Sequence, residues 1–499
     1  MRRLDYIATT LFAVLLLTHA ARAEQLWAGA AKVDITNRNV PANDRLFAKA
    51  LVIRNGTTTT AIVTVDAVAI EEIGYIKAPY LANVRAQLEK DLELKPANIM
   101  INASHCHGVV CADVEARTVQ VVKAAAQNMV PVKVGIGLGH EDRIQENRRL
   151  KLKSGKEVDV RHAYSLPHNE EIASVGPIDP QIGVLRLDKK DGTTLAVVYN
   201  FACHPIQSVA GGGNTADMTG FASQVIEDNL DAGTIALFIQ GCAGDINPVM
   251  YKHVDKPRDA EPLGNMLGLS TLKAVRKIKT KEDERFLVIN ESLELPRADL
   301  AQRIVEMQSE RERLVKSLRG TFLNLQSFMP LAVKYNLAGE FPSYHSHGYL
   351  HEKMLGREHL SKLDAQNRAN LKRYVQNIYT MEQLTRLNTN LALLERHQAR
   401  FLAAPKRTID VEVVGMRIGD FVLVTFPGEL TVQIGLNIKK NSPHQPTFVA
   451  GYTNGYIYYS PTAEQLRNVG GAQEDSDCLL DPGWQKLFEN KVADILKRL

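Results

Sequence analysis

Residues 98–108 read Asn-Ile-Met-Ile-Asn-Ala-Ser-His-Cys-His-Gly, an apolar run that leads into two histidines spaced i, i+2 and then into glycine. The run at 98–101 predicts a short buried strand. Because side chains alternate between the two faces of a strand, we expect His105 and His107 to point the same way and Cys106 to point oppositely. Two imidazoles on one face suit a metal site or a proton relay, while two solvated or packed histidines are the plainer interpretation.

A second histidine stands in the same setting, because the apolar segment Val197-Val198-Tyr199-Asn200-Phe201-Ala202-Cys203 leads directly to His204. Further apolar runs predict strands at 51–54, 60–65, 132–138, 195–201 and 234–239, and amphipathic stretches predict helices at 78–92, 114–128, 220–230 and 262–279. This alternation predicts an α/β fold with a mixed or parallel sheet surrounded by helices. Functional side chains in such folds gather beyond the strand ends, where His105, His204 and the loop at Gly241 would lie.

Residues 298–400 have a different pattern, with apolar residues at helical spacing, many charges and little glycine. We expect a long helical insertion with a looped middle at 339–348, which would reshape the mouth of the site. Its segment Tyr344-His345-Ser346-His347-Gly348-Tyr349-Leu350-His351 is a second candidate metal group or part of the substrate-site lining. Strands are predicted again at 409–414, 421–426 and 447–459, with helices near 430–439 and 482–499.

Residues 1–23 have the features of a secretory signal peptide: Arg2-Arg3, an apolar stretch at 7–17 and the small-x-small sequence Ala21-Arg22-Ala23. We expect cleavage after Ala23, a secreted or periplasmic location, and one domain over 24–499 that contains the insertion. No later stretch approaches the roughly 18 uninterrupted apolar residues of a membrane span, so any membrane contact would be peripheral. A formal net charge of +4 is not that of a nucleic-acid-binding protein.

The chain has five cysteines, too few for a disulfide scaffold at 499 residues. Cys106, Cys203 and Cys242 lie in the segments that could carry chemistry. Strand alternation turns Cys106 and Cys203 away from the neighbouring histidines, so we expect buried packing residues rather than ligands. A disulfide among the five remains an open alternative.

Two C-terminal segments could complete the site. Val422-Leu423-Val424-Thr425-Phe426 ends in the turn Pro427-Gly428, followed by Glu429. A glutamate there is either the acid that caps the next helix or a metal ligand or general base at a strand end. The second segment is Tyr456-Ile457-Tyr458-Tyr459-Ser460-Pro461-Thr462, whose tyrosines alone indicate only half-buried strand residues.

Taken in order, these segments resemble the neutral/alkaline (non-lysosomal) ceramidase family, as a divergent member. The matching motifs are His105-Cys106-His107-Gly108, Asn147-Arg148, Ile178-Asp179-Pro180 with Val184–Leu187, His204, Asp217-Met218-Thr219-Gly220-Phe221-Ala222, Gly244-Asp245-Ile246-Asn247-Pro248, Pro427-Gly428-Glu429 and Tyr456–Thr462. They cover most of 25–290 and 405–465. No single motif is specific, whereas the ordered set is.

The resemblance implies an exported Zn²⁺-dependent amidohydrolase that cleaves an N-acyl bond by attack of zinc-bound water. Carried over position by position, the zinc ligands are His105, His204, Glu429 and Tyr459. His107 would lie beside the metal as a proton donor or oxyanion-stabilising group, and Arg148 would contact the substrate or the developing charge. The set is chemically coherent, since zinc with an open position lowers the pKa of bound water to about 7 and a histidine can protonate the leaving amine.

Departures from the family pattern leave the substrate open. Asn247 replaces the serine usual before proline, which argues against a serine nucleophile, and Gly470-Gly471-Ala472-Gln473-Glu474-Asp475 replaces a second tyrosine followed by glutamate. Ceramide or a related N-acyl lipid is the first expectation. The polar segment 474–477 makes N-acyl sugars, N-acyl amino acids or esters credible alternatives. A non-catalytic binding protein and a phosphatase-like metal site are weaker ones, the latter because the chain offers few aspartates there.

Overall fold

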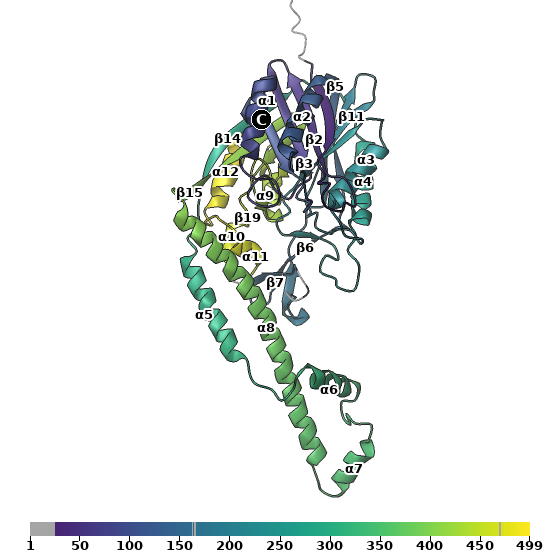
Figure 1. The fold of residues 1–499 in the computed structure, drawn as a ribbon, viewed down its shortest axis with the longest axis vertical. Coiled ribbons are helices and arrows are strands. Elements are labelled where there is room, and N and C mark those ends of the chain that lie inside the picture. Colours follow the sequence, from purple (N-terminus) through teal and green to yellow (C-terminus); the bar gives the residue numbers. More distant parts are fainter. Residues whose placement is uncertain (1–24, 162, 164–165, 469–470) are drawn as a thin grey trace, which may run out of the picture.

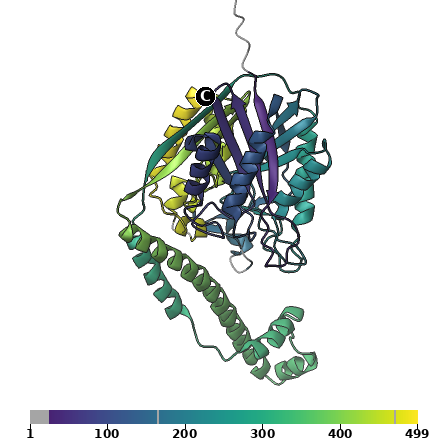
Figure 2. The ribbon, with the colours of Figure 1, turned by 45° about the horizontal axis from the view of Figure 1, so that its top comes forward.

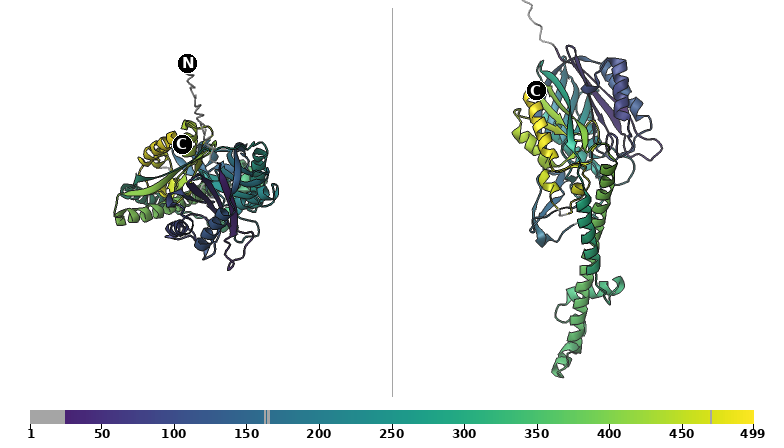
Figure 3. Two further views of the ribbon diagram at one scale, coloured as in Figure 1. Left: turned by 90° about the horizontal axis from the view of Figure 1, so that it is seen from above. Right: turned by 90° about the vertical axis from the view of Figure 1, so that its left-hand side faces the viewer.

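The computed structural model describes residues 25–161, 163, 166–468 and 471–499. The predicted signal peptide therefore lies outside the described residues. The core of the molecule has four layers, with helices outside and two β-sheets between them (Figure 1 and, from above, Figure 3). The fold is thus mixed α/β, as the alternation of apolar runs predicted.

The larger sheet has eight strands, of which β3–β4 and β11–β12 pair in parallel and the other neighbours antiparallel. In spatial order they are β12 (Ile235–Gln240), β11 (Thr194–Phe201), β10 (Gln181–Lys189), β5 (Val130–His140), β1 (Trp27–Asp34), β2 (Phe47–Asn55), β3 (Thr58–Val65) and β4 (Ile99–Ala103). Its outer face is covered by α1 (Tyr80–Leu92), α2 (Val114–Gln127), α3 (Asp217–Asp228) and α4 (Ala260–Val275).

The predicted C-terminal strands form a second sheet rather than extending the first. Its order is β14 (Phe286–Pro296), β15 (Thr408–Ile418), β16 (Phe421–Thr425) and β18 (Phe448–Ala450), with β16 and β18 parallel. Two helices, α9 (Val432–Asn441) and α12 (Trp484–Arg498), cover its outer face. Short elements around the site complete the body: η1 (Pro96–Asn98), β6 (Gln145–Asn147), β7 (Arg149–Leu152), β8 (Glu157–Asp159), η3 (Asn169–Glu171), β9 (Ile172–Val175), β13 (Ile246–Pro248), β17 (Glu429–Leu430), β19 (Tyr459–Ser460), α10 (Ala463–Leu466) and α11 (Gln473–Ser476).

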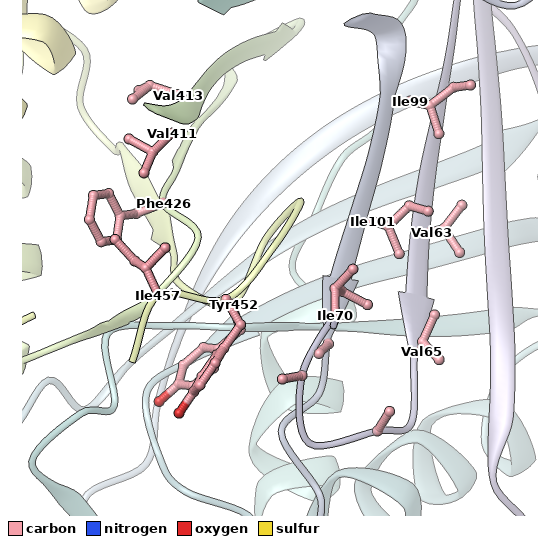
Figure 4. Close-up of a cluster of buried hydrophobic side chains, with 14 of the residues drawn as sticks. Val63, Val65, Ile70, Ile99, Ile101, Val411, Val413, Phe426, Tyr452 and Ile457 are labelled. Atoms are coloured by element: carbon pink, nitrogen blue, oxygen red, sulfur yellow. The ribbon is translucent and has the colours of Figure 1, made fainter. Parts of the chain in front are cut away.

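The two sheets pack face to face through alternate residues of their strands. In β11, Val198 faces the second sheet, while Val197 and Tyr199 face the helices. The approach is close at Gly183, where an added Cβ would lie 2.2 Å from the ring of Phe448. A separate cluster joins the β4 edge of the larger sheet to β15 and the loops after β16 and β18. Figure 4 shows it, with Tyr452 between the strands of the two sheets.

The predicted helical insertion is confirmed. It consists of α5 (Ala301–Ser317), α6 (Leu325–Leu337), α7 (Ser346–Met354) and α8 (His359–Ala403), a single helix of 45 residues. The insertion projects from the body as a long hairpin of α5 and α8 that carries α6 and α7 at its outer end (Figures 1 and 2). None of the described helices is long and apolar enough to cross a membrane.

The predicted strand at 447–459 is wrong in its middle. Only β18 and β19 are strands, and the residues between them form a loop. The backbone of Tyr452, Asn454 and Tyr458 has positive φ, at 53°, 57° and 63°, which is incompatible with an extended strand. These turns carry the tyrosines of the segment toward the site.

Candidate metal centre and cleft

The candidate residues follow the carboxyl ends of parallel strands, where the α/β pattern predicted them. His105 lies two residues beyond β4, His204 three residues beyond β11, and Glu429 after the turn that follows β16. The two sheets are joined at this edge by Asn102, whose side-chain nitrogen donates to Gly451 O at 2.8 Å and whose oxygen accepts from Gln240 N at 3.0 Å. These contacts bring residues from three distant parts of the sequence together.

His105 reaches the site by a turn rather than by strand alternation. The strand ends at Ala103, and His105 itself has a φ of 68°, a left-handed conformation that is costly for a non-glycine residue. His105 and His107 nevertheless border the same cleft, with ring centroids 5.5 Å apart, and Cys106 is buried. The expected arrangement is therefore correct, but the reason given for it, strand periodicity, is wrong.

Three acceptor groups converge in the cleft. His105 Nε2 lies 3.6 Å from Glu429 Oε1, and His204 Nε2 lies 3.0 Å from Glu429 Oε2. All three side chains are at most 2% exposed, and one possible ligand atom of each lies within 4.8 Å of the others. Among the described residues, this is the one group of His, Cys, Asp or Glu close enough to hold a metal ion.

The hydrogen bonds behind the histidines fix which ring nitrogen faces the centre. His105 Nδ1 lies 2.6 Å from Val68 O, and His204 Nδ1 lies 3.0 Å from Ile246 O. A carbonyl oxygen only accepts, so each Nδ1 carries the proton and each Nε2 presents a lone pair. Burial lowers the pKa of His105 to about 4 and also lowers that of His204. Both rings are therefore neutral at pH 7, the form that binds metals.

Glu429 is held as an anion by its neighbours. Its carboxylate accepts hydrogen bonds from the hydroxyls of Tyr456 and, at 3.3 Å, Tyr452. Burial alone would raise the pKa of this carboxyl, whereas a positive charge on or between His105 and His204, together with the Tyr456 hydroxyl, brings the pKa far below its usual value. Glu429 lies in β17 and lines the cleft, while Thr431 is the N-terminal cap of α9, so Glu429 does not cap that helix.

The predicted fourth ligand, Tyr459, borders the same cleft. β19 pairs with β17 so that Tyr459 lies opposite Glu429, and its ring stacks against that of His204 at 6.5 Å between centroids. The guanidinium groups of Arg161 and Arg148 lie 5.0 and 5.6 Å from the Tyr459 ring centre. Burial raises the pKa of the Tyr459 hydroxyl, so it is a phenol in the absence of a cation.

Arg148, the predicted substrate contact, lines the same cleft, but most of its donors are already used. It is 1% exposed and donates to Glu474 Oε1 at 2.7 Å, to Asn247 Oδ1 at 2.9 Å and to Gly244 O at 2.6 Å. The residue that replaces the family's serine, Asn247, thus helps to orient Arg148. The Arg148 side chain still lines the cleft.

The expectation that segment 474–477 presents polar groups to a substrate is wrong for its first two residues. Glu474 and Asp475 are almost fully buried, and Glu474 pairs with Arg148, Arg149 and Arg161. Buried guanidinium groups need carboxylate partners, and this short helix, α11, supplies them. Asp477 does reach the cleft. Sequence reasoning missed Tyr452 and the role of Glu474, since neither lies in a motif that marks a contact.

The second histidine cluster does not line the site. His345, His347 and His351 lie on or beside α7, at the outer end of the insertion (Figure 1). They are exposed, and none of them lines the cleft or belongs to a group that could hold a metal. Of the whole insertion, only Arg396 of α8 lines the cleft, so the insertion shapes the mouth through one end alone. The five cysteines are free thiols.

The cleft above the three acceptors has a volume of about 990 Å³ and a mixed lining. Apolar groups come from Val40, Pro41, Ile73, Val109, Pro205 and Ile206, and cationic groups from Arg148, Arg161, Arg258 and Arg396. His107 is exposed in this cleft. The cleft is within the size range of sites that enclose small-molecule ligands.

Neither a protein-family model nor a curated protein sequence matches the chain. Solved structures do match. A crystal structure of the neutral ceramidase from Pseudomonas aeruginosa superimposes with a TM-score of 0.58 over 95% of this chain and 75% of its own, at 16% identity. A ceramidase described as complexed with C2 gives 0.60 over 95% and 76%, at 17% identity. The chain has the neutral ceramidase fold. The resemblance seen in the ordered motifs is confirmed at the level of the fold.

Proposed function

We propose that this protein is an exported Zn²⁺-dependent amidohydrolase that cleaves an N-acyl bond, with ceramide or a related N-acyl lipid as the first substrate to test. The observation that carries the proposal is the convergence of two buried imidazole lone pairs on one buried carboxylate. Acceptors facing one another are stable only with a cation or a proton between them. Together with the ceramidase fold, this donor set fits zinc.

His105, His204 and Glu429 would hold the metal, with Tyr459 as the fourth ligand. When bound, zinc supplies a Lewis acid that activates water and polarises an amide carbonyl. The remaining steps belong to the chain's own residues.

His107 is the proton carrier of this proposal. It is exposed in the cleft, 5.5 Å from His105 between ring centroids. The walls of the cleft partly desolvate the His107 ring and lower its pKa to about 4, so His107 starts neutral at pH 7. A neutral imidazole must first take a proton from the attacking water and can then return it to the leaving amine nitrogen. Arg148, fixed by Glu474 and Asn247, would orient the carbonyl oxygen.

The test combines metal analysis with an acyl-release assay on the purified full chain. We expect about one zinc per chain, release of fatty acid from ceramide, and loss of both in His204→Ala. The matched control is His444→Ala, which changes a histidine that bonds Leu496 O outside the cleft. Full zinc occupancy in His204→Ala would remove His204 from the ligand set. Retained zinc without turnover of any amide or ester would favour a binding protein on this fold.

A second substrate class is favoured by the cationic lining of the cleft. Arg258 and Arg396 are cleft residues well suited to the carboxylate of an N-acyl amino acid. Arg396 already pairs with Asp477 at 2.7 Å, whereas the Arg258 guanidinium stacks on Tyr251 at 4.3 Å. If the substrate is anionic, Arg258→Gln will raise KM for N-acyl amino acids at least tenfold and leave ceramide hydrolysis unchanged. Equal effects on both would exclude that role.

A further inference from the structure

The outer end of the helical insertion, residues 319–373, is called the tip below. It comprises α6, α7 and the first turns of α8, and it lies far from the body of the molecule (Figures 1 and 3). It contributes nothing to the cleft. Its surface must therefore be explained independently of the reaction.

Helix α6 is apolar on both of its faces. One face packs on α8, where Phe328 stacks on Tyr374 at 4.5 Å between centroids and the Tyr335 hydroxyl donates to Asp364 at 2.7 Å. The opposite face carries Leu325, Met329, Val333 and Leu337, at a constant spacing of four residues and exposed by 62%, 53%, 54% and 82%. A helix with apolar side chains on two faces belongs between two surfaces, and here one of those faces, which also carries Gln326 and Asn336, is uncovered.

Exposed apolar side chains are not confined to α6. Neighbouring parts of the tip add Phe322, Tyr344, Leu350, Met354, Leu355 and Leu363, exposed by 85%, 91%, 57%, 73%, 46% and 51%. Single exposed apolar side chains are ordinary on protein surfaces. A concentration of them on one projecting element indicates a surface that is covered in use.

The tip is also the basic part of the molecule. Residues 319–373 contain eight Lys or Arg side chains against four Asp or Glu, whereas the rest of the described chain is close to neutral. Lys353 and Arg357 are exposed beside the apolar residues of α7. Exposed apolar side chains on an element that also carries a net positive charge are typical of segments that bind anionic lipid headgroups and bury their apolar groups at the acyl boundary.

We propose that the tip docks on an anionic lipid surface, with the exposed face of α6 against the bilayer. The tip could dock on a second copy of itself or on a lipid surface, and its charge favours the lipid. Two copies of the tip would bring equal positive charges together, while an anionic bilayer complements them. This docking requires no catalysis. The proposal therefore stands or falls separately from the proposed hydrolase activity.

The test is co-sedimentation of the purified full chain with vesicles of phosphatidylcholine alone or with about one third phosphatidylglycerol. We expect binding only to the anionic vesicles, weakened by about 0.5 M salt because salt screens surface charges. Met329→Gln/Val333→Gln should lower the bound fraction about tenfold at limiting lipid, since it removes the apolar anchor. Lys353→Gln/Arg357→Gln should lower binding and reduce its salt dependence.

The matched control is Val305→Gln/Val315→Gln on α5, which changes two apolar side chains of similar exposure (55% and 53%) outside the tip. It should bind like the unchanged chain. Circular dichroism verifies that each variant keeps its helix content. Absence of binding to anionic vesicles, or equal binding by the tip and control variants, would overturn the proposal. So would a dimer in sedimentation equilibrium that Met329→Gln/Val333→Gln dissociates, since the occupant would then be a second copy.

Discussion

His204 Nε2 faces the Glu429 carboxylate at 3.0 Å while His204 Nδ1 is committed to the carbonyl of Ile246. An unprotonated imidazole nitrogen and a carboxylate oxygen repel each other at that distance unless a cation lies between them. The backbone behind the histidine has therefore selected the tautomer that makes the centre a ligand set.

Metal removal should destabilise the protein as well as inactivate it. Chelation leaves Glu429 buried against two nitrogen lone pairs, and the free energy of metal binding is lost from the folded state. At a free zinc concentration one thousand times Kd this is about 4 kcal/mol. Calorimetry before and after chelation should show a lower Tm that zinc restores. An unchanged Tm would contradict the assignment of these three residues to a metal.

Tyr456→Phe should weaken metal binding without removing a ligand. The Tyr456 hydroxyl donates to Glu429 Oε1 and helps to hold the carboxylate in place. Loss of such an outer contact lowers metal affinity roughly 10- to 100-fold. Competition with a chromophoric chelator measures the affinity, and Tyr458→Phe, a cleft tyrosine whose ring lies beside the guanidinium groups of Arg396 and Arg400, is the control. Equal affinities of the two variants would show that Tyr456 does not support the ligand.

Glu412→Gln should destabilise the fold in a pH-dependent way. Arg85 Nη1 and Nη2 donate to the two oxygens of Glu412 at 2.6 and 2.8 Å, which ties α1 to β15. Burial would raise the pKa of Glu412, but the bonds from Arg85 outweigh it and lower the pKa. The stabilisation is thus present above the usual carboxyl pKa and is lost as pH falls through the lowered value.

We expect a loss of about 2 kcal/mol at pH 7, because the Gln variant leaves the buried guanidinium without its counter-charge. Urea unfolding at pH 7 and near pH 3.5 measures the difference. The difference in free energy of unfolding between the unchanged chain and Glu412→Gln should narrow at the lower pH. A gap that widens there would mean that Glu412 is not the group responsible.

Gly183→Ala tests the packing of the two sheets. The added Cβ would lie 2.2 Å from the Phe448 ring, which is held between the sheets and cannot withdraw without opening the core. Overpacking of this kind costs about 1–3 kcal/mol. Gly320→Ala, where nothing lies within 4 Å of the new Cβ, should change the free energy of unfolding by only a few tenths of a kcal/mol. Similar behaviour of the two variants would contradict a tight interface at Gly183.

The sequence predicts this fold and centre to the extent that the information is local. Buried strands and amphipathic helices are visible as periodicity, and His105, His204 and Glu429 each follow an apolar run that becomes a strand. The second sheet was not predictable in this way. Whether strands such as β15 and β16 extend one sheet or form another depends on pairings across more than a hundred residues, which alternation does not encode.

The same limit explains the individual misses. Tyr452 reaches Glu429 only because its backbone has positive φ, and no residue type marks that turn. The sequence presents Glu474 as part of a polar segment because its partners, Arg148 and Arg161, are more than three hundred residues away. The histidines on and beside α7 show the opposite case: their local pattern resembles a metal site, but among the described residues no other ligand group is brought close enough to them to hold a metal.

Helix α8 runs without interruption from the tip at His359 to Arg396 at the rim of the cleft. At 1.5 Å per residue this is a rod of roughly 55 Å. In a molecule anchored by the tip, the angle of this rod therefore sets the distance between the lipid surface and the cleft. With α8 upright, the cleft is exposed to solutes well above the surface. With α8 tilted flat, the cleft meets molecules embedded in that surface. The inclination of one helix would select between those two pools of substrate.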